Sequence, residues 1–85
     1  MDRGILVFDQ KEQEWKAWIG QEAYYIGHGD TFELRVINRY FRAYLEKDWE
    51  WFVTLNYEVV FTLHNYEVYK IRINKQDYMK VGTPF

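Results

Sequence analysis

The 85-residue sequence contains no cysteine, no serine and only one proline, and each scarcity excludes something. Without cysteine, the chain can hold neither a disulfide nor a thiolate-bound zinc ion. Without serine as well, the usual Ser–His and Cys–His nucleophile systems are excluded. The single proline, Pro84, lies close to the C-terminus, so no Pro-rich linker divides the chain. We therefore predict one small β domain over residues 1–85, with a C-terminal tail over residues 75–85.

Long apolar runs and a strong net charge are also missing. No apolar run approaches the roughly 20 residues that cross a bilayer, and the first residues lack the basic-then-apolar pattern of a signal peptide. The formal net charge is −2 at pH 7, so no strong global field attracts nucleic acid or anionic lipid. We expect a cytoplasmic protein that makes no membrane contact, binds no cofactor and exists as a monomer or a weak homodimer.

What the sequence has instead is aromatic residues: four Trp, eight Tyr and six Phe. Most of them alternate with polar or charged residues in short runs, a pattern typical of half-buried β-strands. Five to six such strands at roughly 8–12-residue spacing predict an all-β fold, either a small SH3-like barrel or a strongly curved antiparallel sheet. The alternative is a two-layer α+β domain in which residues 21–26 or 77–81 are helical.

The best-defined unit is a hairpin made of Thr31–Ile37 and Tyr40–Glu46. Asn38-Arg39 is the expected two-residue turn. In this register Arg35 lies directly opposite Arg42, and the apolar and polar side chains separate onto two faces, which a one-residue slip would mix. The apolar face collects Phe32, Leu34, Val36, Phe41, Ala43 and Leu45, and the other face collects Glu33, Arg35, Ile37, Tyr40, Arg42 and Tyr44.

Two later strands are predicted less completely. The facing of Trp49–Leu55 stays open, because both of its sides offer apolar residues. The last strand, Glu67–Asn74, is expected to pack one side against the core and to expose basic residues on the other. Its inward residues are Tyr69, Ile71 and Ile73, and its outward residues are Lys70 and Arg72.

The polar face of the hairpin is the main candidate for a binding site. Arginine, tyrosine and tryptophan most often dominate the energetics of protein interfaces, so we predict a protein partner. The predicted surface comprises Arg35, Ile37, Tyr40, Arg42 and Tyr44, with Trp49 or Trp18 at its rim. Single-stranded nucleic acid or RNA is the alternative ligand, because tyrosine rings beside guanidinium groups offer stacking and phosphate neutralisation. A third interpretation is a solvated sheet face that Glu33 and Glu46 neutralise.

The sequence favours no catalytic or metal site. His28 and Asp30 lie together in Gly27–Asp30, either as an acid/base couple or as a turn in which the aspartate caps backbone N–H groups, and we favour the turn. His28 and His64 are the only histidines, and their spacing does not match that of metal ligands. We therefore expect neither an enzyme nor a metal protein.

Several segments also carry a family resemblance. Gly27–Val36 opens with Gly-His-Gly-Asp and continues with alternating apolar and charged residues. Tyr44–Glu46, Trp51–Val53 and the closing Val68–Ile73 extend the match over residues 27–73. Together they resemble a small uncharacterised bacterial family, domain of unknown function 5348, found in Gram-positive bacteria and their mobile elements. The resemblance implies an SH3-like barrel and a bacterial, phage or mobile-element origin, and it implies no known activity or site residues.

Overall fold

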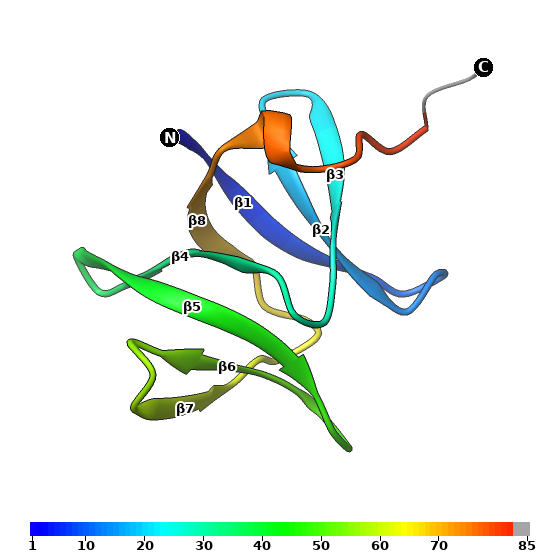
Figure 1. Cartoon of the computed structure of the whole chain (residues 1–85). Coiled ribbons are helices and arrows are strands. Elements are labelled where there is room, and N and C mark those ends of the chain that lie inside the picture. Colours follow the sequence, from blue (N-terminus) through cyan, green and yellow to red (C-terminus); the bar gives the residue numbers. More distant parts are fainter. Residues whose placement is uncertain (83–85) are drawn as a thin grey trace.

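Alternating apolar and polar residues form eight strands in the computed structural model, which describes residues 1–82 (Figure 1). Residues 83–85, the end of the predicted tail, lie outside the described residues. The all-β prediction is confirmed, whereas the count of five to six strands is wrong. No helix in the described part of the chain is long and apolar enough to cross a membrane. The elements are β1 (Asp2–Asp9), β2 (Glu14–Ile19), β3 (Glu22–Ile26), β4 (Thr31–Val36), β5 (Arg39–Lys47), β6 (Trp51–Leu55), β7 (Val59–Thr62), β8 (Tyr69–Ile73) and the 3₁₀ turn η1 (Lys75–Asp77).

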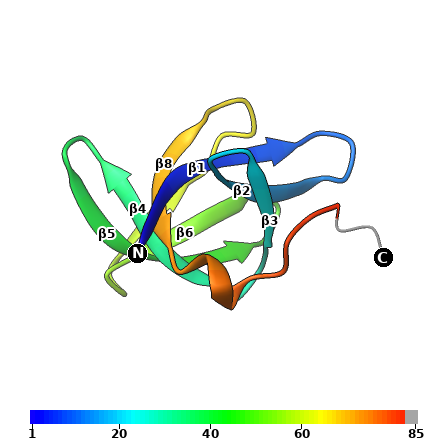
Figure 2. The same cartoon turned by 90° about the horizontal axis from the view of Figure 1, so that it is seen from above.

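The strands form one antiparallel sheet in the order β3-β2-β1-β8-β4-β5-β6-β7. The last strand of the chain, β8, lies in the middle of the sheet between β1 and β4. The sheet curls rather than lying flat, with β1, β2, β3 and β8 in one half and β4 to β7 in the other (Figures 1 and 2). This pairing brings the first strand of the chain beside the last one and places β8 next to the central hairpin.

The inner surface of the curled sheet is apolar and holds the core. Trp15 is fully buried, with its ring packed edge-on against Phe8 at 5.1 Å between centroids and tilted against Tyr69 at 5.9 Å. Large rings suit a small domain, because each can bury about 150–250 Å². The buried core consists of Leu6, Phe8, Trp15, Ala17, Tyr24, Ile26, Phe32, Leu34, Ala43, Leu45, Val53, Leu55, Leu63, Ile71 and Ile73.

Strand β3 occupies the segment for which the sequence left a helix open. Gly20 adopts a φ of 62°, which permits the tight turn that returns the chain from β2 into β3. Tyr24 is buried and Tyr25 is exposed, as the two faces of a strand require. The helical alternative for residues 21–26 is therefore wrong. The sequence pattern did not reveal the strand, because both tyrosines are aromatic and the alternation of buried and exposed residues is hidden.

The C-terminal segment is extended rather than helical beyond η1. The backbone N–H of Tyr25 donates to the carbonyl oxygen of Met79 at 2.9 Å, and the N–H of Val81 donates to that of Ala23 at 2.7 Å. The segment thus covers the outer edge of β3, and the helix considered for residues 77–81 is wrong.

The β4–β5 hairpin has the predicted faces in a different register. Val36 lies opposite Arg39, so the turn is Ile37-Asn38 and the predicted turn Asn38-Arg39 is wrong. The register differs by two residues from the predicted one. Side chains alternate with a period of two along a strand, so this difference leaves every strand residue on its predicted face.

Two strands are shorter than predicted, and the structure shows which side of each one faces the core. β6 begins at Trp51 rather than Trp49, and β8 spans Tyr69–Ile73 rather than Glu67–Asn74. Their alternation is regular, with one side against the core. The inward residues are Val53 and Leu55 of β6 and Tyr69, Ile71 and Ile73 of β8, the last three as predicted.

Candidate functional site

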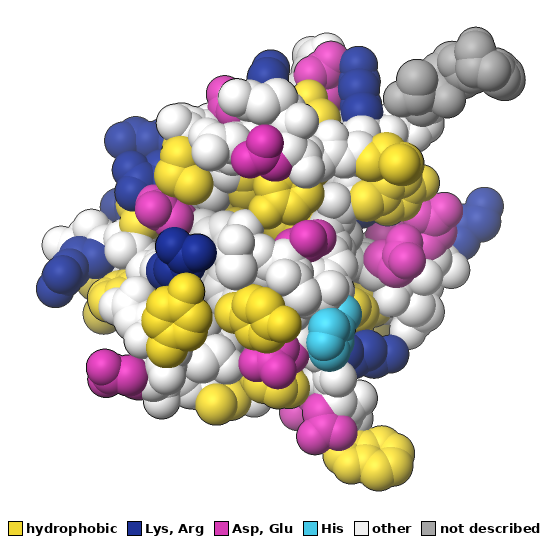
Figure 3. All heavy atoms as spheres, in the orientation of Figure 1, with side chains coloured by type: hydrophobic (Ala, Val, Ile, Leu, Met, Phe, Trp, Pro, Cys, Tyr) yellow, Lys and Arg dark blue, Asp and Glu magenta, His cyan; other side chains and the backbone are white. Residues whose placement is uncertain are grey.

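The outer surface of β8, β4 and β5, with the start of β1, gathers five basic side chains and two carboxylates, a local net charge of +3. The whole chain has a net charge of −2, so this surface differs in sign from the molecule around it. On the side seen in Figure 3, dark blue side chains gather at the left, and yellow ones lie beside them over β5. This arginine–tyrosine face comprises Arg3, Glu33, Arg35, Tyr40, Arg42, Tyr44, Glu46, Lys70 and Arg72.

A row of charged residues crosses four strands of this face. Arg3 of β1 lies opposite Arg72 of β8, Arg72 lies opposite Glu33 of β4, and Glu33 lies opposite Arg42 of β5. Glu33 accepts a hydrogen bond at Oε1 from Nε of Arg72 at 2.9 Å and another from its Nη2. One carboxylate therefore separates two guanidinium groups and holds one of them in a fixed position.

Two arginines of this face also contact tyrosine rings. The guanidinium carbon of Arg72 lies 4.0 Å from the centre of the Tyr40 ring, and that of Arg42 lies 5.8 Å from the centre of the Tyr57 ring. Both are cation–π contacts, which stabilise a partly exposed arginine by about 0.5–1 kcal/mol. The face is therefore ordered before it meets any ligand.

The predicted opposition of Arg35 and Arg42 is wrong. Arg35 lies opposite Tyr40, and Arg42 lies opposite Glu33. The observed register replaces a repulsive pair of like charges with an attractive pair, which is the more stable arrangement on an antiparallel sheet. Nε of Arg35 instead donates to the carbonyl oxygen of Ile37 at 3.2 Å, across the end of the hairpin.

Ile37 lies in the hairpin turn and not on the strand face where it was predicted. Its φ is 62°, a left-handed conformation that is unusual for a β-branched residue, and its side chain is 90% exposed. The turn therefore presents an apolar side chain to solvent at the end of the arginine–tyrosine face, on a backbone that most sequences would fill with Gly or Asn.

The structure places the two predicted rim tryptophans apart from each other. Trp49 lies in the turn between β5 and β6 and is 94% exposed. Trp18 lies on β2, which β1 and β8 separate from β4, and its ring is 38% exposed. Trp18 is therefore separated from the β4–β5 hairpin, and of the arginine–tyrosine face only Arg3, Lys70 and Arg72 share its half of the curled sheet (Figure 1).

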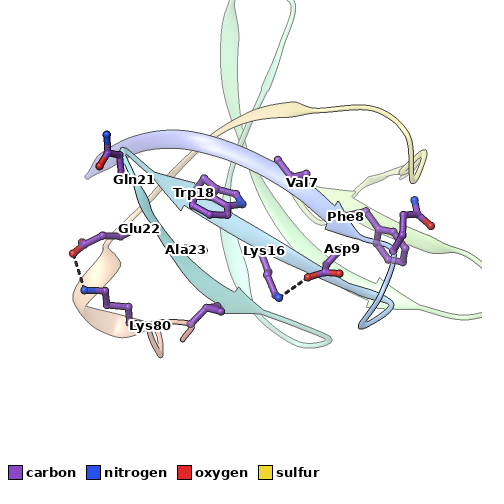
Figure 4. A pocket seen from close by; sticks show the side chains of 11 residues that line it. Val7, Phe8, Asp9, Lys16, Trp18, Gln21, Glu22, Ala23 and Lys80 are labelled. Carbon is purple, nitrogen blue, oxygen red and sulfur yellow. Dashed lines mark hydrogen bonds and ion pairs between the residues drawn. The ribbon is translucent and has the colours of Figure 1, made fainter. Parts of the chain in front are cut away.

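Trp18 borders a groove of about 600 Å³ on the outer side of β1, β2 and β3 (Figure 4). Lys16 also lines this groove and is the buried charged residue among residues 1–82. The sequence alone did not indicate it as a site residue. Its Nζ lies 2.6 Å from Asp9 Oδ2 and 2.7 Å from Glu12 Oε1. The hydrogen bond to Asp9, and after it the one to Glu12, raises the pKa of Lys16, and the bond from Lys16 lowers the pKa of Asp9. Both partners are close in sequence, so this ion pair closes the β1–β2 turn and leaves Lys16 charged.

The Gly27–Asp30 segment is the predicted capped turn. Asp30 accepts a hydrogen bond at Oδ2 from the N–H of Gly27 at 2.8 Å, and Gly29 adopts a φ of 93°. His28 is exposed on this turn. No group of three or more His, Cys, Asp or Glu side chains suited to a metal ion occurs among residues 1–82.

Part of this face can be predicted from the sequence. Lys70 and Arg72 were predicted to point outward, and the pairing of β8 with β4 brings them beside the hairpin. The sequence does not indicate Arg3, nor Tyr57, whose ring contacts Arg42 from outside the face. Arg3 reaches the face only through the pairing of β1 with β8, and no local signal in the sequence indicates which strands are neighbours.

The fold and the face describe a small all-β domain with an ordered basic and aromatic surface. The family model described as a domain of unknown function (DUF5348) matches residues 4–73, and the chain belongs to this family. The predicted resemblance is thus confirmed, and it extends beyond residues 27–73 to include β2, β3 and β1 from Gly4 onward. Comparison with curated proteins gave no match, and comparison with solved structures gave none either.

Proposed function

We propose that this chain is a non-catalytic interaction module that binds a protein partner through its arginine–tyrosine face. The observation that carries the proposal is the ordered cluster in which Glu33 and Tyr40 hold Arg72 between them. Arginine and tyrosine are enriched among the residues that dominate interface energies, and a side chain already held in place loses less entropy on binding. The exposed Ile37 adds an apolar contact at the end of the same surface.

The net charge of the face defines the chemistry of the partner. With five basic side chains against two carboxylates, the face complements an acidic surface. Arg3 and Arg42 are exposed and Arg35 is half-buried, and all three are open to such a partner, whereas Glu33 already holds Arg72. We therefore propose a partner segment that carries carboxylates beside an apolar residue, the latter placed against Ile37.

Binding of single-stranded nucleic acid or RNA is the second candidate, and the local charge of +3 favours it. The geometry of Tyr40 favours the protein partner instead. The guanidinium group of Arg72 lies over the Tyr40 ring at 4.0 Å, where a base would otherwise stack. A nucleic acid would have to rely on Tyr44 and Tyr57 for stacking.

An SH3-like barrel is the finer description of the fold that we propose. The loop after β3 supports it, because this loop bonds to the far half of the sheet. The N–H of Gly29 donates to the carbonyl oxygen of Leu45 at 2.8 Å, and the N–H of Leu45 donates to that of Asp30 at 2.9 Å. We also propose a cytoplasmic role, on the grounds of composition, and an origin in a bacterium, phage or mobile element, on the grounds of the sequence resemblance.

A comparison of two variants tests the partner proposal. The first carries Arg35→Gln, Arg42→Gln and Tyr44→Ala, and it leaves Tyr40 and Arg72 in place. The matched control carries Lys11→Gln and Lys75→Gln, which remove exposed basic charges elsewhere. Affinity capture from the source cell, with mass spectrometry, should recover one partner with the wild type and the control and lose it with the first variant. Capture of the same partner by all three proteins, each folded by amide NMR, contradicts the proposal.

An NMR titration separates the two candidate ligands. We expect mixed-sequence single-stranded DNA and RNA to leave the amide signals of Arg35 to Tyr44 unchanged at both low and moderate salt. Shifts of those signals at low salt that vanish steeply as salt rises would assign the face to nucleic acid, because phosphate binding releases counterions.

A further inference from the structure

The sheet has two edges, and the chain covers only one of them within residues 1–82. The β3 edge is covered by the extended segment around Met79–Val81, whereas no other described strand pairs with the outer side of β7. β7 has the sequence Val-Val-Phe-Thr and lacks the charged residues and prolines that commonly protect a sheet edge. Val60 is 65% exposed on this strand. The edge is therefore open to pairing with another segment.

The register of β7 shows which of its backbone groups are open. The N–H of Leu63 donates to the carbonyl oxygen of Trp51 at 2.9 Å, just beyond the pair formed by Phe52 and Thr62. Antiparallel pairs alternate between bonded and non-bonded positions. Val60 and Thr62 consequently direct their N–H and C=O groups away from β6, toward the free edge.

The side chains of the same two residues line a hollow of about 370 Å³, which we term the Trp49 hollow. Its other walls are Trp49 and Phe52, and Asp48 and Glu50 complete it. The Trp49 side chain is 94% exposed, so both faces of its indole are open to a ligand. The hollow lies on the outer side of the sheet, because Phe52 alternates with the inward Val53.

The charge of the hollow specifies what fits it. Its residues include two carboxylates and no basic side chain. The nearby Lys47 lies over the ring of Trp51 instead, 5.5 Å from its centre. Aromatic walls attract a cation through their electron-rich faces, and carboxylates at the same place add an opposite charge. A lysine or arginine side chain matches both features, and its aliphatic stem matches Val60.

We propose that β7 accepts an extended segment of a partner protein as an additional strand, with a lysine or arginine of that segment seated in the Trp49 hollow. Main-chain hydrogen bonds to Val60 and Thr62 supply the pairing, and the hollow supplies the preference for a basic residue. This site has the opposite charge to the arginine–tyrosine face and involves other strands. It stands or fails independently of the function proposed for that face.

Short blocked peptides test the proposal directly. The probe is acetyl-Thr-Val-Thr-Arg-Thr-Val-Thr-amide, with matched peptides in which Gln or Glu replaces Arg. Titration of the labelled protein should shift the amide signals of Val59–Thr62 and the indole signal of Trp49. We expect the Arg peptide to bind about tenfold more tightly than the Gln peptide, and the Glu peptide more weakly still. Absence of shifts at millimolar Arg peptide, or equal binding of all three, overturns the proposal.

Variants of exposed residues link the binding to the hollow. Trp49→Ala, and Asp48→Asn combined with Glu50→Gln, should each weaken binding of the Arg peptide about five- to tenfold. The control Glu14→Gln combined with Glu67→Gln removes two exposed carboxylates outside the hollow and should leave binding unchanged. Wild-type affinity in both hollow variants contradicts the proposal.

Backbone methylation tests the added strand. Two versions of the Arg peptide carry N-methyl groups on one or the other set of alternate residues. One version should lose binding, because its methyl groups face β7, and the other should retain it. Retention in both assigns the binding to the side chain alone. Shifts of Val59–Thr62 that depend on protein concentration without peptide assign the edge to a second copy of the chain. Either result overturns the proposal.

Discussion

The guanidinium group of Arg72 is held between the Tyr40 ring, 4.0 Å from its carbon, and the carboxylate of Glu33, which accepts its Nε hydrogen at 2.9 Å. The three residues come from β8, β5 and β4, and Glu33 and Arg72 are 39 positions apart in the sequence. This cluster fastens the last strand to the central hairpin on the outer surface, while Ile71 and Leu34 pair beside it on the inner one.

The Arg72–Tyr40 contact should be measurable as a coupling energy. In a double-mutant cycle with Arg72→Gln and Tyr40→Leu, we expect a coupling of about 0.5–1 kcal/mol in the free energy of unfolding, because the pair is only partly buried. The measurement is urea denaturation of the four proteins. The cycle of Arg72→Gln with Tyr44→Leu is the control and should be additive. Additive behaviour of the Tyr40 cycle would show that the close contact contributes nothing.

Gly4 occupies a position that no side chain can share. A Cβ at this residue would lie 2.1 Å from the carbonyl oxygen of Trp18, which is backbone and cannot rotate away. Gly4→Ala should therefore lower the free energy of unfolding by about 2 kcal/mol or more, because β1 and β2 must move apart. Gly27→Ala is the control, since nothing lies within 4 Å of a Cβ there, and it should stay within about 0.5 kcal/mol of wild type. Thermal unfolding followed by circular dichroism compares them, and equal melting temperatures would contradict the prediction.

A substitution at Ile37 is expected to stabilise the fold rather than to destabilise it. A β-branched residue at a φ of 62° costs roughly 1 kcal/mol relative to a residue that tolerates this conformation. Ile37→Asn should therefore raise the free energy of unfolding by about 1 kcal/mol, whereas Ile37→Val, which keeps the branch, should not. If Ile37 is part of the binding surface, Ile37→Asn should also weaken partner binding while it stabilises the fold. Urea denaturation measures the first effect, and a stability unchanged by Asn would show that the turn holds no strain.

The same residue explains how far the sequence could predict the hairpin. The faces followed from the alternation of Phe32 to Val36 and of Phe41 to Leu45, because the period of two is independent of where the turn falls. The register depended on the turn, and Asn38-Arg39 has the more favourable composition. The structure instead places Ile37 at the left-handed position, which composition disfavours. The observed register pairs Glu33 with Arg42 and separates Arg35 from Arg42, which offsets part of the strain in the turn.

The full set of residues on the arginine–tyrosine face could not be predicted from any short segment of the sequence. Arg35, Tyr40 and Arg42 could be grouped because they lie on one hairpin. The addition of Arg3 and the separation of Trp18 depend on the position of β8 between β1 and β4, which is a pairing between the two ends of the chain. Hydrophobic periodicity determines which side of a strand faces the core, but it does not specify the neighbouring strand.

Tyr78 couples stability to alkaline pH. Its hydroxyl donates to the carbonyl oxygen of Thr31 at 2.5 Å, and burial, followed by the charges of Asp30 and Asp77, raises its pKa from 10.0 to about 12. Because the folded pKa is raised, the stability it contributes is fully present below pH 10 and is lost as the pH rises from 10 to 12. Tyr78→Phe should thus flatten the decline in melting temperature over this window. The decline should not vanish, because the pKa values of Tyr24 and Tyr69 are also raised.

The variant has a second expected effect at neutral pH. Tyr78→Phe removes the hydrogen bond to Thr31 and should lower the free energy of unfolding by about 1 kcal/mol. Tyr66→Phe is the control, since its side chain is 91% exposed and it should alter neither quantity. Absorbance at about 295 nm during an alkaline titration counts the tyrosines that ionise late and should lose one of them in Tyr78→Phe. If the variant keeps both the wild-type slope and the wild-type number of late tyrosines, the Tyr78 hydroxyl is exposed in solution and the C-terminal segment does not pack against β4.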